Sequence, residues 1–320
     1  MSTSNAGVLV TGGAGFIGAA VVRSLLARGA DVTVADKRPS AEHGVRSVTG
    51  DLRRPEIVDQ AMARPVAAIV HLAAETSVLA STSNPVEVYE TNVALTLALL
   101  ERCRVGGVRS FVLASTNAVV GDVGEALIDE ESPLRPLTPY GATKAAAEML
   151  VSAYSASYDI AGSAVRLTNV YGPGMQEKDS LVARLMRTWQ AQGSVSIYGD
   201  GDQVRDYLYI DDAVQGILLA LDTGVVGPVT VGSGISTSVN DLHHLLGDVT
   251  GIDLALPHVA ARPGEMPAVR VRIDQARRLG YQPRTNLRQG LEATWEFFRG
   301  SGRATDAGDG GSYGVPHGSG

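Results

Sequence analysis

The segment with the clearest chemical potential holds a tyrosine and a lysine four residues apart. Thr138 can cap the start of a helix, and Pro139 suits its first position. Tyr140 and Lys144 then lie on one face of that helix. A nearby ammonium group and the positive end of the helix both favour the phenolate, which lowers the tyrosine pKa. The segment therefore predicts a base that removes a proton from a hydroxyl group. The same spacing is also common in helices with an exposed tyrosine and a solvated lysine.

A glycine-rich turn follows the first predicted strand, Gly7–Thr11. Gly13, Gly15 and Gly18 have the spacing GxGxxG, and Gly12 extends the pattern to GxxGxxG. Glycines let the pyrophosphate of a dinucleotide approach the backbone, and the N-terminus of the next helix supplies N–H donors and a positive dipole. Because the turn lies between a strand and an amphipathic helix, it predicts a dinucleotide site rather than an ordinary tight turn.

A carboxylate after the second strand indicates which dinucleotide binds. Asp36 lies 18 residues after Gly18, close to the ~20 expected for the group that binds the adenosine ribose hydroxyls. A carboxylate there repels the 2′-phosphate of NADP, so we predict NAD. Lys37 and Arg38 follow and weaken this preference, and a solvated aspartate at a strand end is the alternative. After the third strand, Asp51–Leu52 could flank the adenine.

Two small hydroxyl side chains follow another predicted strand. Ser115 and Thr116 come directly after Ser110–Ala114. The carboxyl ends of strands in a doubly wound sheet are where ligands bind. Either hydroxyl could therefore form a hydrogen bond with the reacting oxygen, or either could only cap the local turn.

The spacing of apolar runs predicts an α/β fold with a doubly wound parallel sheet, that is, a Rossmann fold. Apolar strands alternate with helical patterns, which is typical of a parallel sheet covered on both faces. After about residue 170, shorter elements between loops rich in glycine and proline indicate a smaller C-terminal substrate-binding domain. The expected strands are Gly7–Thr11, Asp31–Ala35, Val45–Thr49, Val66–Leu72, Ser110–Ala114 and Ser163–Thr168, and the clearest helices are Ile17–Arg28, Pro85–Val105 and Thr138–Tyr158.

These patterns also predict the domain boundaries. We expect residues 1–170 to form the dinucleotide-binding domain, with a return segment near residues 207–235. Residues 171–299 are expected to form mainly the substrate-binding domain. Residues 300–320 are dominated by glycine and serine and are predicted to form a flexible tail.

The composition restricts the class of function. A formal net charge of −7 argues against a general nucleic-acid or anionic-membrane surface. Cys103 is the only cysteine, so no intrachain disulfide forms, and the cytoplasm is the simplest location. No apolar stretch approaches the ~20 residues that span a membrane. Adjacent His243 and His244 point to different faces of a helix, so we expect structural or solvated histidines and no metal.

Together these segments resemble the extended short-chain dehydrogenases that modify nucleotide sugars, which include UDP-glucose 4-epimerases, dTDP-glucose 4,6-dehydratases and UDP-glucuronate decarboxylases. The resemblance is greatest to the 4-epimerases and covers about residues 7–299. It implies NAD as cofactor, a nucleotide-diphosphate sugar as substrate, and a homodimer through Pro85–Val105 and Thr138–Tyr158. It rests on Thr11–Gly18, His71–Ala74, Thr91–Val93, Ser115–Gly121, Tyr140–Lys144, Arg166–Pro173, Tyr198–Gly201, Val204–Asp212 and Arg262–Glu265.

The resemblance implies a role for individual positions. Thr116 resembles the hydroxyl that contacts the sugar O4 beside Tyr140, and Lys144 resembles the group that binds the nicotinamide ribose. The expected catalytic residues are therefore Thr116, Tyr140 and Lys144. The expected cofactor contacts are Gly12, Gly15, Phe16, Ile17, Gly18, Asp36, Asp51, Leu52, Leu72, Ala73, Ala74, Tyr140 and Lys144.

The same comparison implies a diphosphate site. Asn169 resembles an amide that contacts the sugar diphosphate, and Arg205 and Arg262 resemble arginines that clamp it. An ion pair with Asp206 or Asp211 is the alternative for Arg205. Asn92 is expected to support the catalytic helix rather than touch the ligand. The expected substrate contacts are Thr116, Asn117, Asn169, Arg205 and Arg262.

Departures from the family pattern distinguish among its reactions. The dehydratases carry Thr-Asp-Glu where this chain has Thr116-Asn117-Ala118, and the decarboxylases carry a glutamate in place of Ala118. Removal of water across C5–C6 needs one group to take the C5 proton and another to protonate the leaving hydroxyl. An amide and a methyl group can do neither, whereas epimerization at C4 needs no such acid. Val120 replaces a usual tyrosine and leaves the details of the sugar pocket open.

The leading interpretation is therefore NAD-dependent 4-epimerization of a UDP-hexose or related nucleotide sugar through a transient 4-keto sugar. Another redox enzyme on a nucleotide sugar, such as a 4-ketoreductase or an atypical dehydratase, is the main alternative. A non-catalytic NAD-binding regulator is a third interpretation.

Overall fold

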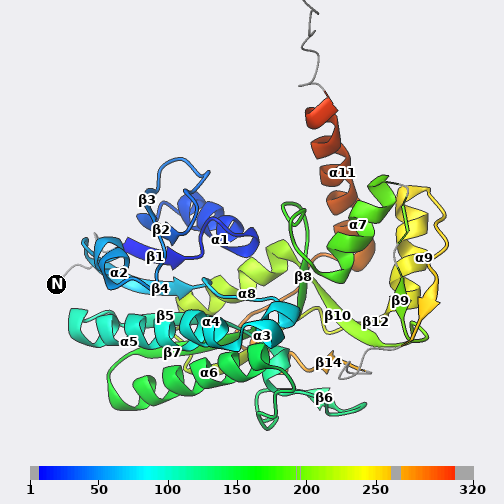
Figure 1. Ribbon diagram of the computed structural model, residues 1–320. Coiled ribbons are helices and arrows are strands. Elements are labelled where there is room, and N and C mark those ends of the chain that lie inside the picture. Colours follow the sequence, from blue (N-terminus) through cyan, green and yellow to red (C-terminus); the bar gives the residue numbers. More distant parts are fainter. Residues whose placement is uncertain (1–6, 192, 195, 261–267, 307–320) are drawn as a thin grey trace, which may run out of the picture.

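A parallel sheet of seven strands forms the centre of the chain (Figure 1). The computed structural model describes residues 7–306 except 192, 195 and 261–267. The strands of this sheet are β1 (Gly7–Thr11), β2 (Val32–Asp36), β3 (Arg46–Thr49), β4 (Val66–His71), β5 (Ser110–Thr116), β7 (Ala161–Leu167) and β11 (Gly227–Val231). They lie in the order β11-β7-β5-β4-β1-β2-β3, and every neighbouring pair is parallel.

The predicted doubly wound α/β fold is confirmed by this sheet. All six expected strands belong to it, with ends shifted by at most two residues. The seventh strand, β11, was not among the expected strands. Its sequence begins Gly227-Pro228, and proline interrupts most strands because it has no N–H to donate. Proline is tolerated here because β11 pairs only with β7 and forms the edge of the sheet.

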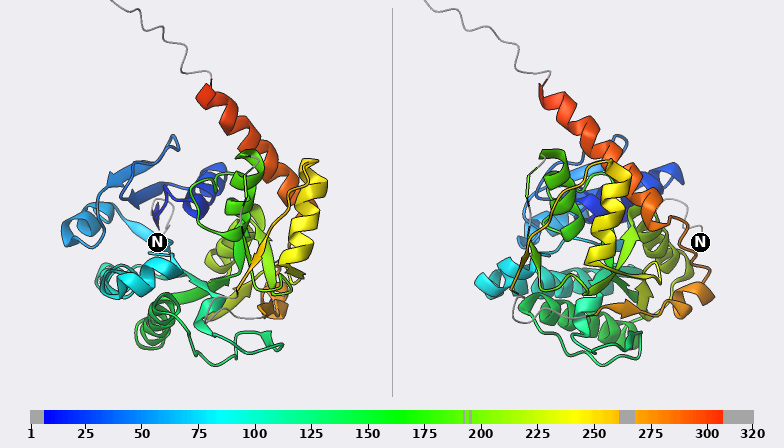
Figure 2. Two further views of the ribbon diagram at one scale, coloured as in Figure 1. Left: turned by 45° about the vertical axis from the view of Figure 1, so that its right-hand side comes forward. Right: turned by 90° about the vertical axis from the view of Figure 1, so that its right-hand side faces the viewer.

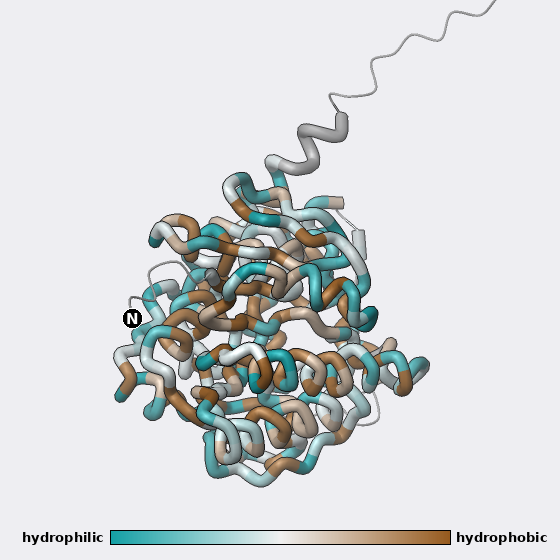
Figure 3. Tube along the Cα trace, turned by 90° about the vertical axis from the view of Figure 1, so that its left-hand side faces the viewer, coloured by the Kyte–Doolittle hydropathy of each residue, from teal (hydrophilic) through white to brown (hydrophobic). Residues whose placement is uncertain are grey.

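Helices cover both faces of the sheet because successive strand residues point to opposite sides. Val10, Val70 and Val112 pack on one side, whereas Leu9 and Ile69 pack on the other. The helices of the first side are α1 (Phe16–Ala27) and α8 (Ile210–Thr223). Those of the second are α2 (Pro55–Ala61), α5 (Leu95–Gly106) and α6 (Pro139–Ser157). Figure 3 shows apolar and polar positions interspersed along the helical turns of the chain.

The helix expected over Pro85–Val105 is interrupted by a wider turn. The structure has α4 (Pro85–Tyr89), a π-helical turn η1 (Glu90–Ala94) and then α5. A short helix, α3 (Val78–Ser83), precedes them. Apolar periodicity cannot reveal a single widened turn, because the apolar face continues on either side of it. Such π turns are frequent at functional sites.

A second lobe lies beyond the carboxyl ends of the parallel strands (Figure 2). Its core contains Trp189, Leu242 and Leu291. Its helices are α7 (Leu181–Ala191), α9 (Val239–Thr250) and α11 (Leu287–Asp306). Its strands are β8 (Asn169–Tyr171), β10 (Val204–Tyr209), β12 (Ser236–Ser238), β9 (Ile197–Tyr198) and β13 (His258–Val259). Smaller elements near the boundary are β6 (Leu127–Ile128), β14 (Arg270–Val271), α10 (Asp274–Arg278) and the 3₁₀ turn η2 (Asn117–Val119).

The end of the chain differs from the expected tail. Helix α11 continues to Asp306, so residues 300–306 are helical rather than part of the tail predicted to begin at Gly300. Composition alone does not reveal how far backbone hydrogen bonds extend a helix once it has begun. Residues 307–320 lie outside the described residues. The chain returns to the main sheet through α8 and β11, and the division into domains stays a prediction.

Two adjacent phenylalanines test how α11 is held. Phe298 is 1% exposed in the core of the second lobe, whereas Phe297 is 41% exposed. We expect Phe298→Ala to lower the free energy of unfolding by about 3–5 kcal/mol, because it leaves a cavity. Phe297→Ala is the matched control and should cost less than about 1 kcal/mol. Urea unfolding followed by circular dichroism measures both, and equal losses would contradict the packing of α11 described here.

Candidate active site

The predicted cofactor and catalytic residues gather at the carboxyl edge of the parallel sheet. The strand order reverses at β1, which has β2 on one side and β4 on the other. In doubly wound sheets such a switch point leaves a crevice at the strand ends where ligands bind. The glycine turn follows β1, and the segment Leu72–Ala74 follows β4, so the two face each other across this point.

The glycine turn has a shape that only glycine allows. Gly12 has a φ of 71°, and a Cβ atom added there would lie 2.6 Å from the backbone nitrogen of Ala73. A Cβ atom on Gly18 would lie 2.0 Å from the carbonyl oxygen of Gly12. Gly15 caps the start of α1 with its backbone, and Phe16 and Ile17 form the first turn of that helix. This backbone cradle at a helix N-terminus fits a dinucleotide pyrophosphate.

The segment after β4 is held against the same turn. The backbone N–H of Leu72 donates to the Thr11 carbonyl at 3.0 Å, and that of Ala73 donates to Thr11 Oγ1 at 3.4 Å. Ala74 follows and is partly exposed. Leu72 and Ala73 therefore adjoin the glycine turn, where the sequence pattern predicts cofactor contacts, and the contact expected for Ala74 stays a prediction.

Asp36 reaches from the end of β2 to the glycine turn. Its Oδ2 accepts a hydrogen bond from the Ala14 N–H at 3.1 Å, and its Oδ1 accepts one from the Arg38 N–H at 3.0 Å. The Arg38 guanidinium donates to the Ala14 carbonyl at 3.2 Å and pairs with Glu177 at 3.3 Å. A carboxylate and a guanidinium thus both border the cradle.

Asp51 and Leu52 follow β3. The Asp51 carboxylate pairs with Arg53 at 2.6 Å and with Lys37 at 3.9 Å. The hydrogen bond from Arg53 is the main cause that lowers the pKa of Asp51 to about 2. The Leu52 side chain is buried against the face that α2 and α5 cover. The expected contact of these two residues with adenine stays a prediction.

Tyr140 lies close to the end of β5 because α6 approaches that strand without a side chain between them. Thr138 Oγ1 accepts from the Gly141 N–H at 3.1 Å, and Pro139 is the first helical residue, which confirms the predicted cap. A Cβ atom on Gly141 would lie only 2.6 Å from the Ala118 carbonyl oxygen. This close approach brings Tyr140 within hydrogen-bonding distance of Thr116.

The expectation that Tyr140 has a lowered pKa is wrong for the protein alone. Burial raises the pKa of Tyr140 to about 12, and the hydrogen bond with Thr116 only partly opposes this. The Lys144 ammonium, which was expected to lower that pKa, donates instead to the Ala114 carbonyl at 3.0 Å. Helical spacing predicts a shared face but not the rotamer that brings two charges into contact.

The two hydroxyls at the end of β5 have different partners. Ser115 donates to the carboxylate of Glu148 in the interior. Thr116 Oγ1 accepts from the Ala118 N–H at 3.2 Å and lies beside Tyr140. Of the two hydroxyls that the sequence left open, Thr116 is therefore the one positioned to meet a ligand, and it also caps the local turn.

Lys144 is buried beside His71, which the sequence pattern placed in a family motif but to which it gave no role. Burial lowers the pKa of Lys144 to about 8 and, together with the Lys144 charge, that of His71 to about 3. His71 Nδ1 lies 2.7 Å from Thr11 Oγ1, and its Nε2 lies 3.1 Å from Thr96 Oγ1. Because Thr96 donates onward to the Asn92 carbonyl, we assign the His71 proton to Nε2.

Asn92 supports the catalytic helix, as expected. On the π turn η1, its Nδ2 donates to the Glu75 carbonyl at 3.0 Å and to Thr143 Oγ1 at 3.1 Å, and its Oδ1 accepts from the Glu75 N–H at 2.9 Å. Thr143 in turn donates to the Tyr140 carbonyl at 2.8 Å. The loop after β4, the π turn and α6 are thereby held together next to Tyr140.

The expected diphosphate residues lie in the small sheet of the second lobe. Asn169 is exposed on β8, and its Nδ2 donates to the Asp206 carbonyl at 3.1 Å. Arg205 on β10 is partly buried and donates to the Val204 carbonyl at 2.8 Å. The Asp206 carboxylate accepts hydrogen bonds from Thr168, Ser233 and Gly234. Arg262 lies outside the described residues.

Two positions outside the expected site have clear structural surroundings. Val120, which replaces a usual family tyrosine, is buried in the core between the sheet and α8. His243 donates to the Leu254 carbonyl at 2.7 Å and packs against Trp189. Within residues 7–306 and outside the gaps, no cluster of His, Cys, Asp or Glu has the arrangement of a metal site. Nor is any described helix long and apolar enough to cross a membrane.

Lys178 joins the second lobe to the sheet, and the sequence pattern missed it. Its Nζ donates to Thr76 Oγ1 at 3.4 Å in the loop after β4, and burial lowers its pKa while Glu75 opposes that effect. The rarity of lysine in the sequence could have drawn attention to it, because the chain has only three lysines: Lys37, Lys144 and Lys178. All three lie around the carboxyl edge of the sheet.

Comparison with known proteins agrees with this geometry. Residues 8–232 match the family described as the NAD dependent epimerase/dehydratase family. A dTDP-glucose 4,6-dehydratase of Streptomyces griseus is 35% identical over 91% of this chain and 93% of its own length. The UDP-glucose 4-epimerase of Thermotoga maritima, solved with UDP-glucose, has a TM-score of 0.88 and 32% identity over 92% of this chain and 99% of that chain. The UDP-glucose 4-epimerase of Thermus thermophilus, solved with NAD, has a TM-score of 0.86 and 34% identity over 92% of this chain and 99% of that chain.

The pair Asp36 and Arg38 predicts how the cofactor preference can be changed. We expect Asp36→Asn to raise the affinity for NADP relative to NAD by about tenfold, because it removes a charge that repels the 2′-phosphate. Arg38 beside the glycine turn would then attract that phosphate. Calorimetric titration of nucleotide-free protein measures both affinities. Adding Arg38→Ala should cancel the gain, and an unchanged ratio in Asp36→Asn would show that this carboxylate does not select the cofactor.

Proposed function

The chain belongs to the NAD-dependent epimerase/dehydratase family, and we propose that it interconverts the C4 epimers of a nucleotide-diphosphate sugar. Its cofactor is NAD, which its backbone cradle and Asp36 fit. A UDP-hexose is the leading substrate, since the relative from Thermotoga maritima binds UDP-glucose.

The observation that carries this proposal is the pair of residues after Thr116. Asn117 and Ala118 form the turn against which the first turn of α6 packs, so they lie next to Tyr140. Loss of water across C5 and C6 needs a base for the C5 proton and an acid for the leaving hydroxyl. A neutral amide and a methyl group supply neither function. Besides hydride transfer with NAD, epimerization at C4 requires only the proton transfer that Tyr140 can perform.

The proposed mechanism assigns one task to each residue. Thr116 holds the sugar O4 by a hydrogen bond, and the Tyr140 phenolate takes the O4 proton. Because burial raises the pKa of Tyr140 to about 12, a base near neutral pH needs positive charge close by. Lys144, on the same helix face, supplies that charge and binds the nicotinamide ribose. When bound, NAD would supply the hydride acceptor and donor for C4. Tyr140 would give the proton back to O4 as the hydride returns to the other face of the ketone.

The second lobe holds the remainder of the substrate in this proposal. Asn169 and Arg205 lie on neighbouring strands of the small sheet, β8 and β10. An exposed amide and a guanidinium are suitable donors for a diphosphate. Arg262 is proposed as a second guanidinium of the same clamp.

A second candidate has an observation in its favour. The Streptomyces griseus relative is a dehydratase, and its identity to this chain is as high as that of the epimerases above. Overall similarity therefore does not separate the two reactions, and a ketoreductase uses the same tyrosine and lysine. The fate of the hydrogens at C4 and C5 of the sugar distinguishes these reactions.

One reaction in D₂O with a C4-deuterated substrate tests the proposal. We expect product and substrate to be isomers, with the label retained at C4 and no solvent deuterium at C5. A single hydride leaves and returns at C4, and neither the Asn117 amide nor the Ala118 methyl group can exchange the C5 proton. Proton NMR and mass spectrometry follow both positions in a panel of UDP- and dTDP-hexoses.

The competing reactions give different outcomes in the same tube. A dehydratase would lose about 18 mass units as water and exchange C5, whereas a reductase would take its hydride from added cofactor. Either result would sink the epimerase assignment. The Tyr140→Phe protein is the matched control: it keeps the buried ring and should keep NAD, but it has no group to accept the O4 proton and should not turn over.

We also propose a homodimer through the helices of the second face of the sheet. Large apolar side chains are exposed there on consecutive helices. They are Val86 and Tyr89 on α4, Leu97 and Val105 on α5, and Met149 on α6. Exposed apolar residues grouped on one surface are typical of subunit interfaces, and a two-fold axis would bury each group against its own copy.

A charge placed on this surface tests the dimer. Leu97 is 40% exposed on α5, so Leu97→Glu should not disturb the core, but it should dissociate the dimer at micromolar concentration. Light scattering measures the mass. Val226→Glu is the control, because Val226 is 58% exposed in the turn after α8, away from this surface. A monomeric wild-type protein would refute the proposal.

A further inference from the structure

A buried ion pair lies one helical turn beyond Lys144 on α6. The carboxylate of Glu148 pairs with Arg166 of β7 at 2.8 Å, and the two side chains are only 6% and 3% exposed. Nε and Nη2 of Arg166 both donate to this carboxylate, which also accepts a hydrogen bond from the Ser115 hydroxyl. Ser115 and Arg166 are paired across β5 and β7, so two neighbouring strands direct donors at one helix position.

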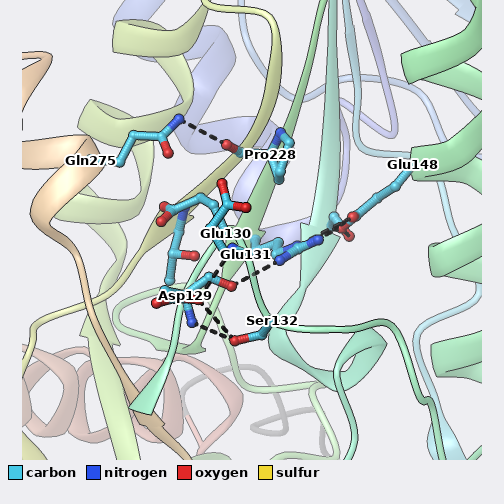
Figure 4. Close-up of polar contacts among 10 residues, drawn as sticks. Asp129, Glu130, Glu131, Ser132, Glu148, Pro228 and Gln275 are labelled. Atoms are coloured by element: carbon cyan, nitrogen blue, oxygen red, sulfur yellow. Dashed lines mark hydrogen bonds and ion pairs between the residues drawn. The ribbon is translucent and has the colours of Figure 1, made fainter.

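Arg166 connects this carboxylate to the segment that leads into the catalytic helix. Its Nη1 donates to the Asp129 carbonyl at 3.1 Å, and Figure 4 shows Asp129 and Glu148 on opposite sides of that contact. The same segment is fixed at Ser132, whose hydroxyl donates to Asp129, and at Glu130, which accepts from the Thr230 N–H at 2.7 Å. One guanidinium therefore links Glu148 on α6 to the segment around Asp129.

The interior around Lys144 contains more cationic than anionic groups. Lys144 and Arg166 are both buried, and Glu148 is the carboxylate that α6 presents to them. His71 on β4 is neutral because its pKa is lowered to about 3, and Tyr140 on α6 is a neutral phenol because its pKa is raised. Asn92 and Thr143 nearby carry no charge. The carboxylate of Asp129, whose carbonyl contacts Arg166, is 27% exposed and lies 3.7 Å from Arg272, and that of Glu75 accepts from the Ser77 N–H.

We propose that Glu148 is a positioning residue that keeps Lys144 charged and in place by offsetting the buried charge of Arg166. Two cations that share a low-dielectric interior repel each other strongly unless an anion lies between them. Glu148 favours the ammonium form of Lys144, and its loss would leave Arg166 without its partner in the same interior. The catalytic consequence rests on the proposed role of Lys144, whereas the charge coupling itself does not.

The scarcity of lysine makes the coupling directly measurable. Protein labelled with 13C at the lysine ε carbon has three resonances, from Lys37, Lys144 and Lys178. Lys37→Arg and Lys178→Arg identify the signal of Lys144. Its chemical shift, followed from pH 6 to 11 in the holoprotein by NMR, reports protonation without any sugar substrate. Failure of the epimerase assignment would therefore leave this experiment unaffected.

Three variants give the test. Glu148→Gln keeps the shape and an acceptor oxygen but removes the charge, and we expect the midpoint of the Lys144 titration to fall by about one pH unit or more. Glu148→Gln combined with Arg166→Met also removes the second cation, and the midpoint should rise part of the way back. Asp212→Asn is the matched control: Asp212 is a buried carboxylate on α8 that accepts from the Arg284 and Thr285 N–H groups, and its loss should leave the midpoint unchanged.

The outcomes separate positioning from simple structural support. An unchanged Lys144 midpoint in Glu148→Gln would overturn the proposal, even if that protein were less stable. A double variant with a midpoint as low as that of Glu148→Gln would also overturn it, because Arg166 would then not be the cation that Glu148 offsets. The proposal is supported if the Lys144 midpoint falls in Glu148→Gln and returns part of the way in the double variant.

Discussion

The close packing of α6 on the end of β5 is the constraint on which the site depends. Gly141 allows the first helical turn to approach the Ala118 carbonyl, where any side chain would collide with the backbone. The approach places Tyr140 beside Thr116 and lets Lys144 reach the Ala114 carbonyl. One turn later, Glu148 enters the interior and meets donors from β5 and β7. A helix held farther from the sheet could make none of these contacts.

Features encoded by neighbouring residues could be predicted from the sequence, whereas pairings between distant residues could not. The glycine turn, the Thr138 cap and six strands follow from local spacing and periodicity. The pair Glu148 and Arg166 joins residues 18 positions apart on a helix and a strand, and the sequence around neither residue reveals its partner. The π turn at Asn92 leaves no trace in apolar periodicity. Strand β11 is concealed by a proline that only an edge position permits.

Burial explains why the tyrosine and lysine cannot be understood from their spacing alone. In water, a lysine four residues from a tyrosine contributes a screened charge of small effect. In this interior, desolvation raises the pKa of Tyr140 and lowers that of Lys144, so both groups favour their neutral forms. The charged form of either group must then be stabilised by a specific partner of opposite charge. The Glu148 carboxylate is such a partner for Lys144, because it favours the ammonium form.

The same scaffold serves both epimerization and dehydration in this family, so the choice of reaction must lie in a small number of side chains. The sheet, the cradle and the network around α6 position Tyr140 and Lys144, the residues proposed to act in either reaction. The turn after Thr116 is where this chain differs, because Asn117 and Ala118 occupy positions next to the reacting sugar in the proposed site. Changing these two residues would alter which proton can be moved while leaving Gly141, Asn92 and Glu148 in their roles. Identity of about one third to both kinds of relative is therefore expected, and it leaves the chemistry at C5 and C6 to be decided by that turn.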